Sequence, residues 1–182
     1  MSIFSKEDKI KAFSLLGDFL NQPDKNFEVI MLEAQNHNAW FTVDEVKRSV
    51  VSIANMLNET DLRKWFFTYA ENTKLFKVGV VLAGNLPLVG FHDVLCILAS
   101  GNKALIKLSS QDNQLLIAVL EQLFLIEPRF KFMVEIVFKL ENFDSIIATG
   151  SNNTSRYFEY YFAKVPHIIR KNRNTVAVLN GN

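Results

Sequence analysis

The stretch KVGVVLAGNLPLVGFHDVLCILASGNKALIKLSS, residues 77–110, decides the fold of this chain. It opens with an apolar, β-branched run at residues 78–82, turns at Ala83-Gly84-Asn85, and continues into an apolar segment at 89–100. A second short apolar run at 104–107 ends on a lysine, with two serines close behind it. This order predicts a strand, a helix and a second strand, which is the repeating unit of a parallel sheet.

The stretch FDSIIATGSNNTSRYFEYYF, residues 143–162, has the same organisation. An apolar strand at 145–148 leads into the turn Thr149-Gly150-Ser151, and a helix is predicted at 153–162. A strand that delivers glycine and hydroxyl residues to the start of a helix creates an anion site, because the first N–H groups of the helix have no internal partners. Three such strand ends in one sheet predict a nucleotide lying across its carboxyl edge.

The rest of the sequence completes an α/β pattern. Residues 5–70 are predicted to be mostly helical, with a break near Pro23. Two pairs resemble helix-start capping pairs, Ser5 with Asp8 and Thr42 with Glu45. The other predicted segments are a helix at 112–126 and strands at 132–137, 167–169 and 176–179. We therefore predict a Rossmann-like, mostly parallel sheet with helices on both faces in residues 76–182, and an N-terminal helical segment, residues 1–75, that packs on it.

Composition excludes several classes of protein. Apolar residues make up 49% of the 182 residues, enough for a sizeable core, and the formal net charge of +1 provides no field that would attract nucleic acid or an anionic membrane. One cysteine rules out an internal disulfide framework, and three scattered histidines argue against a metal cluster. No apolar run approaches the ~20 residues of a membrane span. The N-terminal residues carry charges where a signal peptide needs an apolar stretch, so we predict a cytoplasmic protein.

The motifs in these stretches resemble those of the aldehyde dehydrogenase superfamily, and more closely those of its bacterial long-chain acyl-CoA reductases, the Lux-type fatty acyl-CoA reductases. Residues 83–88, AGNLPL, stand where the superfamily has Pro-Trp-Asn-x-Pro-Leu. Lys107 matches the lysine that ends the family's next strand, whereas Ser110 replaces the usual acid three residues later. The Thr-Gly-Ser turn at 149–151 is unaltered. The resemblance covers about residues 76–182.

The resemblance implies a catalytic role for Asn85, whose side-chain amide would donate to the oxyanion of the reacting thioester. It also counts Gly84 among the cofactor-binding residues. From spacing alone, a residue that closes the strand-to-helix turn by local hydrogen bonding is the favoured interpretation of Asn85, and the resemblance reverses that order.

The resemblance assigns the next strand end to the adenosine ribose of a dinucleotide. Lys107 would bind the ribose hydroxyls, with Ser109 and Ser110 beside it. A carboxylate at position 110 would repel a 2′-phosphate, and serine has no charge with which to do so, so we favour NADPH, with NADH as the runner-up. The alternatives are a lysine that simply reaches solvent and two serines that cap a helix from Gln111 onward.

The third strand end is assigned to the pyrophosphate. Gly150 would let the backbone approach closely, and the hydroxyl and N–H of Ser151 would bind phosphate oxygens, with Thr149 completing the turn. A plain strand-to-helix turn is the alternative.

Two departures from the family limit the chemistry. The segment at 169–173, IRKNR, stands where the superfamily carries its general-base glutamate, and it contains no acid. A reductive thioester reaction, which needs no base to activate water, is therefore favoured over hydrolytic aldehyde oxidation. The family's catalytic cysteine lies further downstream, and Cys96 is predicted to be a small buried hydrophobe with no base beside it. Two roles are open for the basic residues of 170–173: they are exposed to solvent at the edge of the sheet, or they contact phosphates of CoA or of the cofactor.

The resemblance thus implies the cofactor-binding portion of an NAD(P)H-dependent acyl-CoA reductase, an oxidoreductase that makes fatty aldehyde from acyl-CoA. Two other classes stay open: a non-catalytic nucleotide-binding or assembly module, and an α/β interaction domain whose motifs are coincidental. Acyl-CoA is the expected partner, nucleic acid and a membrane span are not expected, and a homo-oligomer is left open.

Overall fold

The computed structural model describes residues 4–70, 74–171 and 176, and it begins with four helices. They are α1 (Lys6–Asn21), α2 (Lys25–His37), α3 (Val43–Met56) and α4 (Glu59–Thr68). The predicted break near Pro23 lies between α1 and α2. The capping pair at the start of α1 is confirmed, since Asp8 N donates to Ser5 Oγ (3.1 Å) and Ser5 N donates to Asp8 Oδ2 (3.3 Å).

Five parallel strands form the sheet, in the order β3-β2-β1-β4-β5. They are β1 (Lys77–Val81), β2 (Lys103–Lys107), β3 (Val134–Ile136), β4 (Ser145–Thr149) and β5 (His167–Arg170). The first strand lies at the centre because the chain crosses over on one side through β2 and β3 and returns on the other side through β4 and β5. The predicted α/β class with a parallel sheet is confirmed.

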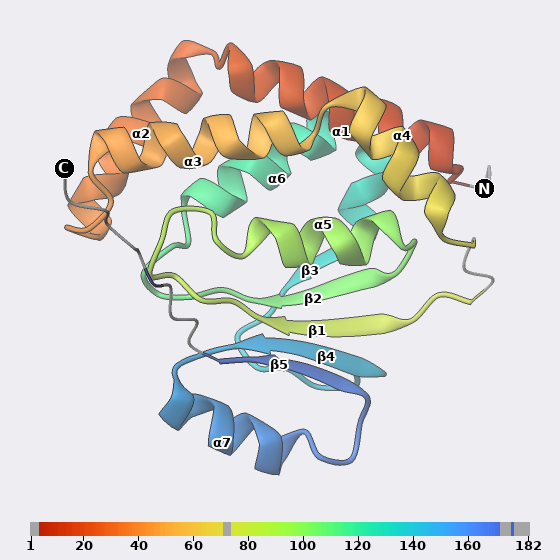
Figure 1. The fold of residues 1–182 in the computed structure, drawn as a ribbon. Coiled ribbons are helices and arrows are strands. Elements are labelled where there is room, and N and C mark those ends of the chain that lie inside the picture. Colours follow the sequence, from red (N-terminus) through yellow and green to blue (C-terminus); the bar gives the residue numbers. More distant parts are fainter. Residues whose placement is uncertain (1–3, 71–73, 172–175, 177–182) are drawn as a thin grey trace, which may run out of the picture.

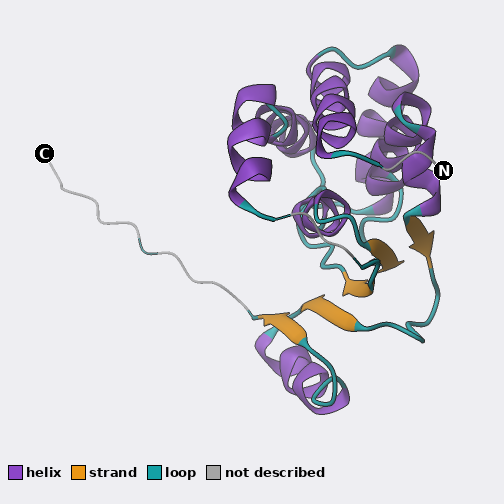
Figure 2. Cartoon of the chain, turned by 90° about the vertical axis from the view of Figure 1, so that its right-hand side faces the viewer, coloured by secondary structure: helices purple, strands orange, loops and turns teal. Residues whose placement is uncertain are grey.

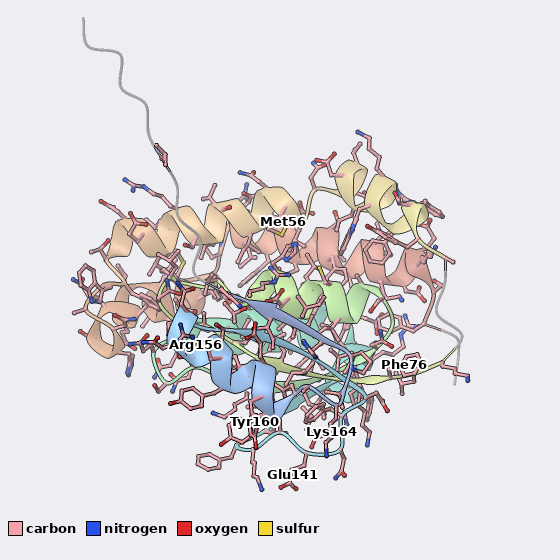
Figure 3. All side chains as sticks on the ribbon, turned by 60° about the horizontal axis from the view of Figure 1, so that its bottom comes forward. Met56, Phe76, Glu141, Arg156, Tyr160 and Lys164 are labelled. Atoms are coloured by element: carbon pink, nitrogen blue, oxygen red, sulfur yellow. The ribbon has the colours of Figure 1, made fainter. Side chains whose placement is uncertain are left out.

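Helices cover both faces of this sheet (Figure 1). One face packs against α5 (Phe91–Ala99) and α6 (Leu115–Ile126), and the four N-terminal helices lie over these two. The other face carries α7 (Asn152–Tyr161), next to β4 and β5 (Figure 2). Its outward side presents Arg156 and Tyr160 to solvent (Figure 3).

One hydrophobic core joins the N-terminal helices to the sheet. Phe13 of α1 is fully buried, and its ring centroid lies 5.0 Å from that of Phe130 and 6.2 Å from that of Phe66 on α4. Phe130 belongs to a short 3₁₀ helix, η1 (Pro128–Phe132), which precedes β3. On the far face of the sheet, the rings of Phe143 and Phe162 pack edge to face at 5.9 Å.

Two predicted segments differ from the structure, and a third cannot be compared with it. The helix predicted at 112–126 begins only at Leu115, and the strand predicted at 132–137 is reduced to β3 after the 3₁₀ turn. The strand predicted at 176–179 lies outside the described residues except for Val176. Among the described helices, none has the length and apolarity needed to cross a membrane.

Candidate functional site

The three motif-bearing strand ends meet at the carboxyl edge of the sheet. Val81, the last residue of β1, is paired with Lys107 on one side and with Ala148 on the other. The turns that follow β1, β2 and β4 therefore lie side by side at the point where the strand order reverses (Figure 1). In open α/β sheets this is where a ligand binds.

The turn after β1 is pressed against the turn after β2. Gly84 is buried, and a Cβ added to it would lie 2.6 Å from the Cβ of Ser109 and 3.1 Å from the backbone nitrogen of Asp112. Glycine is needed here because the two turns approach closely. The neighbouring Asn85 is exposed, and its side chain makes no hydrogen bond to any residue that the structure describes.

Asn38, the C-cap residue that follows α2, contacts the same two turns. Its side-chain nitrogen lies 3.4 Å from the carbonyl oxygen of Gly84 and 3.5 Å from that of Gln111, and its side-chain oxygen accepts from Trp40 N at 3.0 Å. The N-terminal helices thus contribute to the carboxyl edge, which the sequence analysis did not foresee.

A buried carboxylate supports the segment between Asn85 and α5. Asp112 is 7% exposed, and its Oδ2 accepts a 2.7 Å hydrogen bond from Leu88 N, where the backbone has a positive φ of 58°. Burial raises the pKa of the Asp112 carboxyl, and hydrogen bonds from the N–H groups of Leu88 and Leu116 partly offset this. Asp112 was assigned to a helix from the sequence and its contact was missed.

Substitution of Asp112 tests this support. Asp112→Ala should lower the free energy of unfolding by about 1–2 kcal/mol, because the buried N–H of Leu88 loses its acceptor. Asp112→Asn keeps an acceptor oxygen and should lose less than half as much. Urea denaturation followed by circular dichroism measures both. Equal losses for the two variants would mean that a neutral acceptor oxygen at position 112 does not support the turn.

The turn after β2 holds the residues predicted to read the ribose. Lys107 and Ser110 are exposed, and Ser109 is half-buried with its Oγ accepting from Gln111 N at 3.2 Å. Ser109 also forms an isolated bridge with Asp112. The alternative that these serines cap the following helix is wrong, because residues 109–113 form a turn and the residue before α6 is Gln114.

The turn after β4 has a capped helix start. Ser151 Oγ accepts from Thr154 N at 3.2 Å, and a Cβ added to Gly150 would lie 3.0 Å from the ring of Phe158. The glycine therefore lets α7 close tightly over the end of β4. Thr149, the last residue of that strand, is half-buried, and the N-terminus of α7 faces the carboxyl edge.

The basic residues at the end of β5, Arg170 and Lys171, form ion pairs with carboxylates of the protein. Arg170 pairs with Asp93 of α5 (Nη2 to Oδ1, 2.8 Å), and Asp93 is only 4% exposed. Lys171 pairs with Glu159 of α7 at 2.6 Å. Arg173 lies outside the described residues. The ion pair of Arg170 thus joins β5 to α5. The sequence did not predict this contact.

Cys96 lies on α5 with a histidine beside it. Its sulfur is 3.8 Å from His92 Nε2, and the residue is half-buried, so the expectation of a buried cysteine without a neighbouring base was wrong. The four-residue spacing on one helix was the available signal. Burial raises the pKa of the Cys96 thiol, which disfavours the thiolate. Among the described residues, no group of three or more His, Cys, Asp or Glu side chains could hold a metal ion.

Comparison with known proteins gives one family and a set of similar folds. The model of the family described as acyl-CoA reductase (LuxC) matches residues 25–164. The comparison with curated proteins gave no match. Three solved structures illustrate the fold similarity.

Aldehyde dehydrogenase 21 from Physcomitrella patens, in complex with succinate, has a TM-score of 0.74 at 13% identity, over 95% of this chain and 41% of that one. Betaine aldehyde dehydrogenase from Staphylococcus aureus, in complex with NAD⁺, has a TM-score of 0.70 at 14% identity, over 91% and 38%. The glyceraldehyde-3-phosphate dehydrogenase GapN from Methanocaldococcus jannaschii, complexed with NADP, has a TM-score of 0.55 at 12% identity, over 90% and 45%. The chain therefore spans less than half the length of each of these relatives, and identities this low establish the fold alone.

Proposed function

Since the chain belongs to the acyl-CoA reductase (LuxC) family, as its motifs indicated, we propose that it is the cofactor-binding portion of an enzyme that reduces an acyl-CoA thioester to the fatty aldehyde. The observation that carries this proposal is the meeting of three strand ends at one sheet edge, those of β1, β2 and β4, which bring Asn85, Lys107 and Gly150 to that edge. Residues 76–182 would form the dinucleotide-binding domain, and residues 1–75 would pack on it as a helical segment.

Asn85 is the proposed catalytic residue. When a thiolate from elsewhere in the enzyme adds to the thioester carbonyl, negative charge develops on the oxygen, and the exposed Asn85 amide would donate a hydrogen bond to it. Loss of one such donor typically costs ~10²–10³ in rate. The tight contact of Gly84 with Ser109 and the bond from Leu88 N to Asp112 support the segments on either side of this residue.

The residues at the edge fit a dinucleotide. Lys107 and Ser110 are exposed at the end of β2 and would contact the adenosine ribose, with Ser109 shaping the turn. The N-terminus of α7, preceded by Gly150 and Ser151, would receive the pyrophosphate, because helix N-termini favour anions. NADPH is the preferred cofactor since no carboxylate stands at position 110 to repel a 2′-phosphate, and NADH is second. When bound, the cofactor supplies the hydride.

Nuclear magnetic resonance can locate the dinucleotide site even if the affinity is low. NADPH titrated into the ¹⁵N-labelled chain should shift the backbone amides of residues 83–85, 107–112 and 149–152, and leave those at the opposite ends of the strands unchanged. Adenosine alone should shift only the second group, because it lacks the pyrophosphate and nicotinamide. Shifts confined to another surface, or no shifts at millimolar NADPH, would overturn the proposed site.

A non-catalytic nucleotide-binding module is the second candidate, favoured by the raised pKa of the Cys96 thiol. For either candidate, residues 1–182 alone should show no acyl-CoA-dependent oxidation of NADPH, because the chain's single cysteine is half-buried and burial raises the pKa of its thiol, which disfavours the nucleophilic thiolate. Absorbance at 340 nm measures this reaction. Turnover that disappears in Cys96→Ala would contradict the expectation and make Cys96 the nucleophile.

A further inference from the structure

An exposed tryptophan lies in the short loop between α2 and α3. Trp40 is 84% exposed, whereas tryptophan side chains are highly buried on average in folded proteins. Packing within the chain therefore does not account for the position of this indole. A flat aromatic ring held in solvent is suited to stacking on a planar ligand.

The loop is anchored on both sides of this residue. Trp40 N donates to Asn38 Oδ1 at 3.0 Å, and Phe41 N donates to the carbonyl oxygen of Asn38 at 2.8 Å. The side chain of Phe41 is buried and belongs to the hydrophobic core. Because the backbone around Trp40 is already fixed, a ligand that stacks on the indole has little loop entropy to remove.

One side-chain amide joins this loop to the turns at the carboxyl edge of the sheet. Asn38 Nδ2 lies 3.5 Å from the carbonyl oxygen of Gln111 and 3.4 Å from that of Gly84. The oxygen of the same amide accepts the bond from Trp40 N. Gln111 directly follows Ser110, the residue proposed to face the adenosine ribose. Figure 1 shows the loop at the same end of the molecule as the turns after β1 and β2, so Trp40 lies beside the ribose end of the proposed site.

We propose that Trp40 stacks on the adenine ring of the dinucleotide, an inference that rests on the proposed function because it takes the adenosine ribose to lie at the end of β2. The adenine is bonded directly to that ribose, so it lies at the same end of the site. Stacking of a base on an aromatic side chain typically strengthens binding about fivefold to a hundredfold. Coenzyme A carries the same base, and we assign the contact to the dinucleotide because the loop of Trp40 contacts the turn that contains Ser110.

The indole N–H of Trp40 reports the contact directly. The chain has two tryptophans, and the second, Trp65, lies on α4 at the other end of the molecule (Figure 1). In the ¹⁵N-labelled chain, with the two indole signals assigned by means of Trp40→Phe, adenosine and NADPH should shift the Trp40 signal saturably and leave that of Trp65 unchanged. Nicotinamide mononucleotide should shift neither, because it has no adenine. Coenzyme A should shift neither at concentrations that saturate the response to NADPH.

Variants separate stacking from a general loss of structure. Trp40→Ala should weaken adenosine binding, measured from the amide shifts of residues 107–112, about fivefold to a hundredfold. Trp40→Phe keeps an aromatic ring and should weaken it less than about threefold. Tyr160→Ala, the matched control, removes a ring of similar exposure (81%) from α7 and should leave adenosine binding unchanged. All three substitutions are at exposed positions, so the urea midpoints of the variants should match that of the parent chain.

The outcomes distinguish this contact from the site as a whole. If NADPH shifts residues 107–112 but not the Trp40 indole, or if Trp40→Ala binds adenosine as tightly as the parent chain, the stacking is overturned and the dinucleotide site stands. A larger indole shift with nicotinamide mononucleotide than with adenosine, or with coenzyme A than with NADPH, would also overturn the assignment to the adenine of the dinucleotide. Absence of every shift at millimolar NADPH would overturn the proposed site and this contact with it.

Discussion

Replacing Gly84 by alanine should destabilise the fold by about 3 kcal/mol, at the upper end of the usual cost of overpacking. The added methyl group would lie 2.6 Å from the Cβ of Ser109. It could not shift toward Asp112, because the backbone nitrogen of that residue already lies 3.1 Å away. The turns after β1 and β2 must then separate. Because these turns carry Asn85 and Lys107, NADPH binding should weaken as well. Urea denaturation and NADPH titration measure the two effects.

Two matched variants identify the cause. Gly79→Ala places a methyl group in β1 at 3.4 Å or more from its nearest neighbours, which is ordinary contact, and should cost less than about 1 kcal/mol. Combining Gly84→Ala with Ser109→Gly removes the clashing side chain and should recover at least half of the lost stability. If Gly84→Ala is tolerated as well as Gly79→Ala, the two turns are not in contact and the arrangement of the site must be revised.

The sheet could be predicted because its signals are local. Apolar runs of about five residues with turn residues behind them indicated β1, β2 and β4, and the segments that follow β1 and β4 indicated α5 and α7. The start of α6 could not be predicted in this way. Asp112 follows a serine-rich turn and precedes an apolar helix, so it reads as a helix residue, yet its carboxylate binds Leu88 N, 24 residues away in the chain. That tertiary contact holds residues 109–113 in a turn.

In the candidate site, too, the local motifs could be predicted from the sequence and the long-range contacts could not. Glycine and hydroxyl residues at strand ends are visible in the sequence because strand-to-helix turns need them. The contacts that fix the turns are between distant residues: Asn38 reaches Gly84 across 46 positions, and Arg170 finds its partner Asp93 on another element. An asparagine at the end of a helix and an aspartate within an apolar helix carry no sequence signal for such partners. The sequence therefore predicted only that the N-terminal helices pack on the sheet domain. In the structure, Asn38 also contacts the turns at the carboxyl edge of the sheet.

Cofactor choice should respond strongly to a charge at position 110. If Ser110 faces the adenosine ribose, Ser110→Glu should weaken NADPH binding about tenfold to a hundredfold, because the carboxylate would repel the 2′-phosphate at a partly desolvated site. NADH has no 2′-phosphate, and the new carboxylate can accept hydrogen bonds from its ribose, so NADH binding should be equal or better. Titration of both nucleotides into both proteins gives the four affinities that are needed.

Two neighbouring substitutions decide how the result is understood. Gln111→Glu adds the same charge one residue further along the exposed turn and should change the ratio of the two affinities less than threefold, since two charges about 7 Å apart that interact through water contribute only about 0.6 kcal/mol. Lys107→Ala should weaken both nucleotides to a similar extent, because the ribose hydroxyl contact is common to them. A selective effect of Ser110→Glu, with these two controls, places that residue at the 2′ position. Equal responses of NADPH and NADH to Ser110→Glu would mean that the end of β2 does not face the adenosine ribose, and the dinucleotide would then have to cross the sheet edge in another orientation.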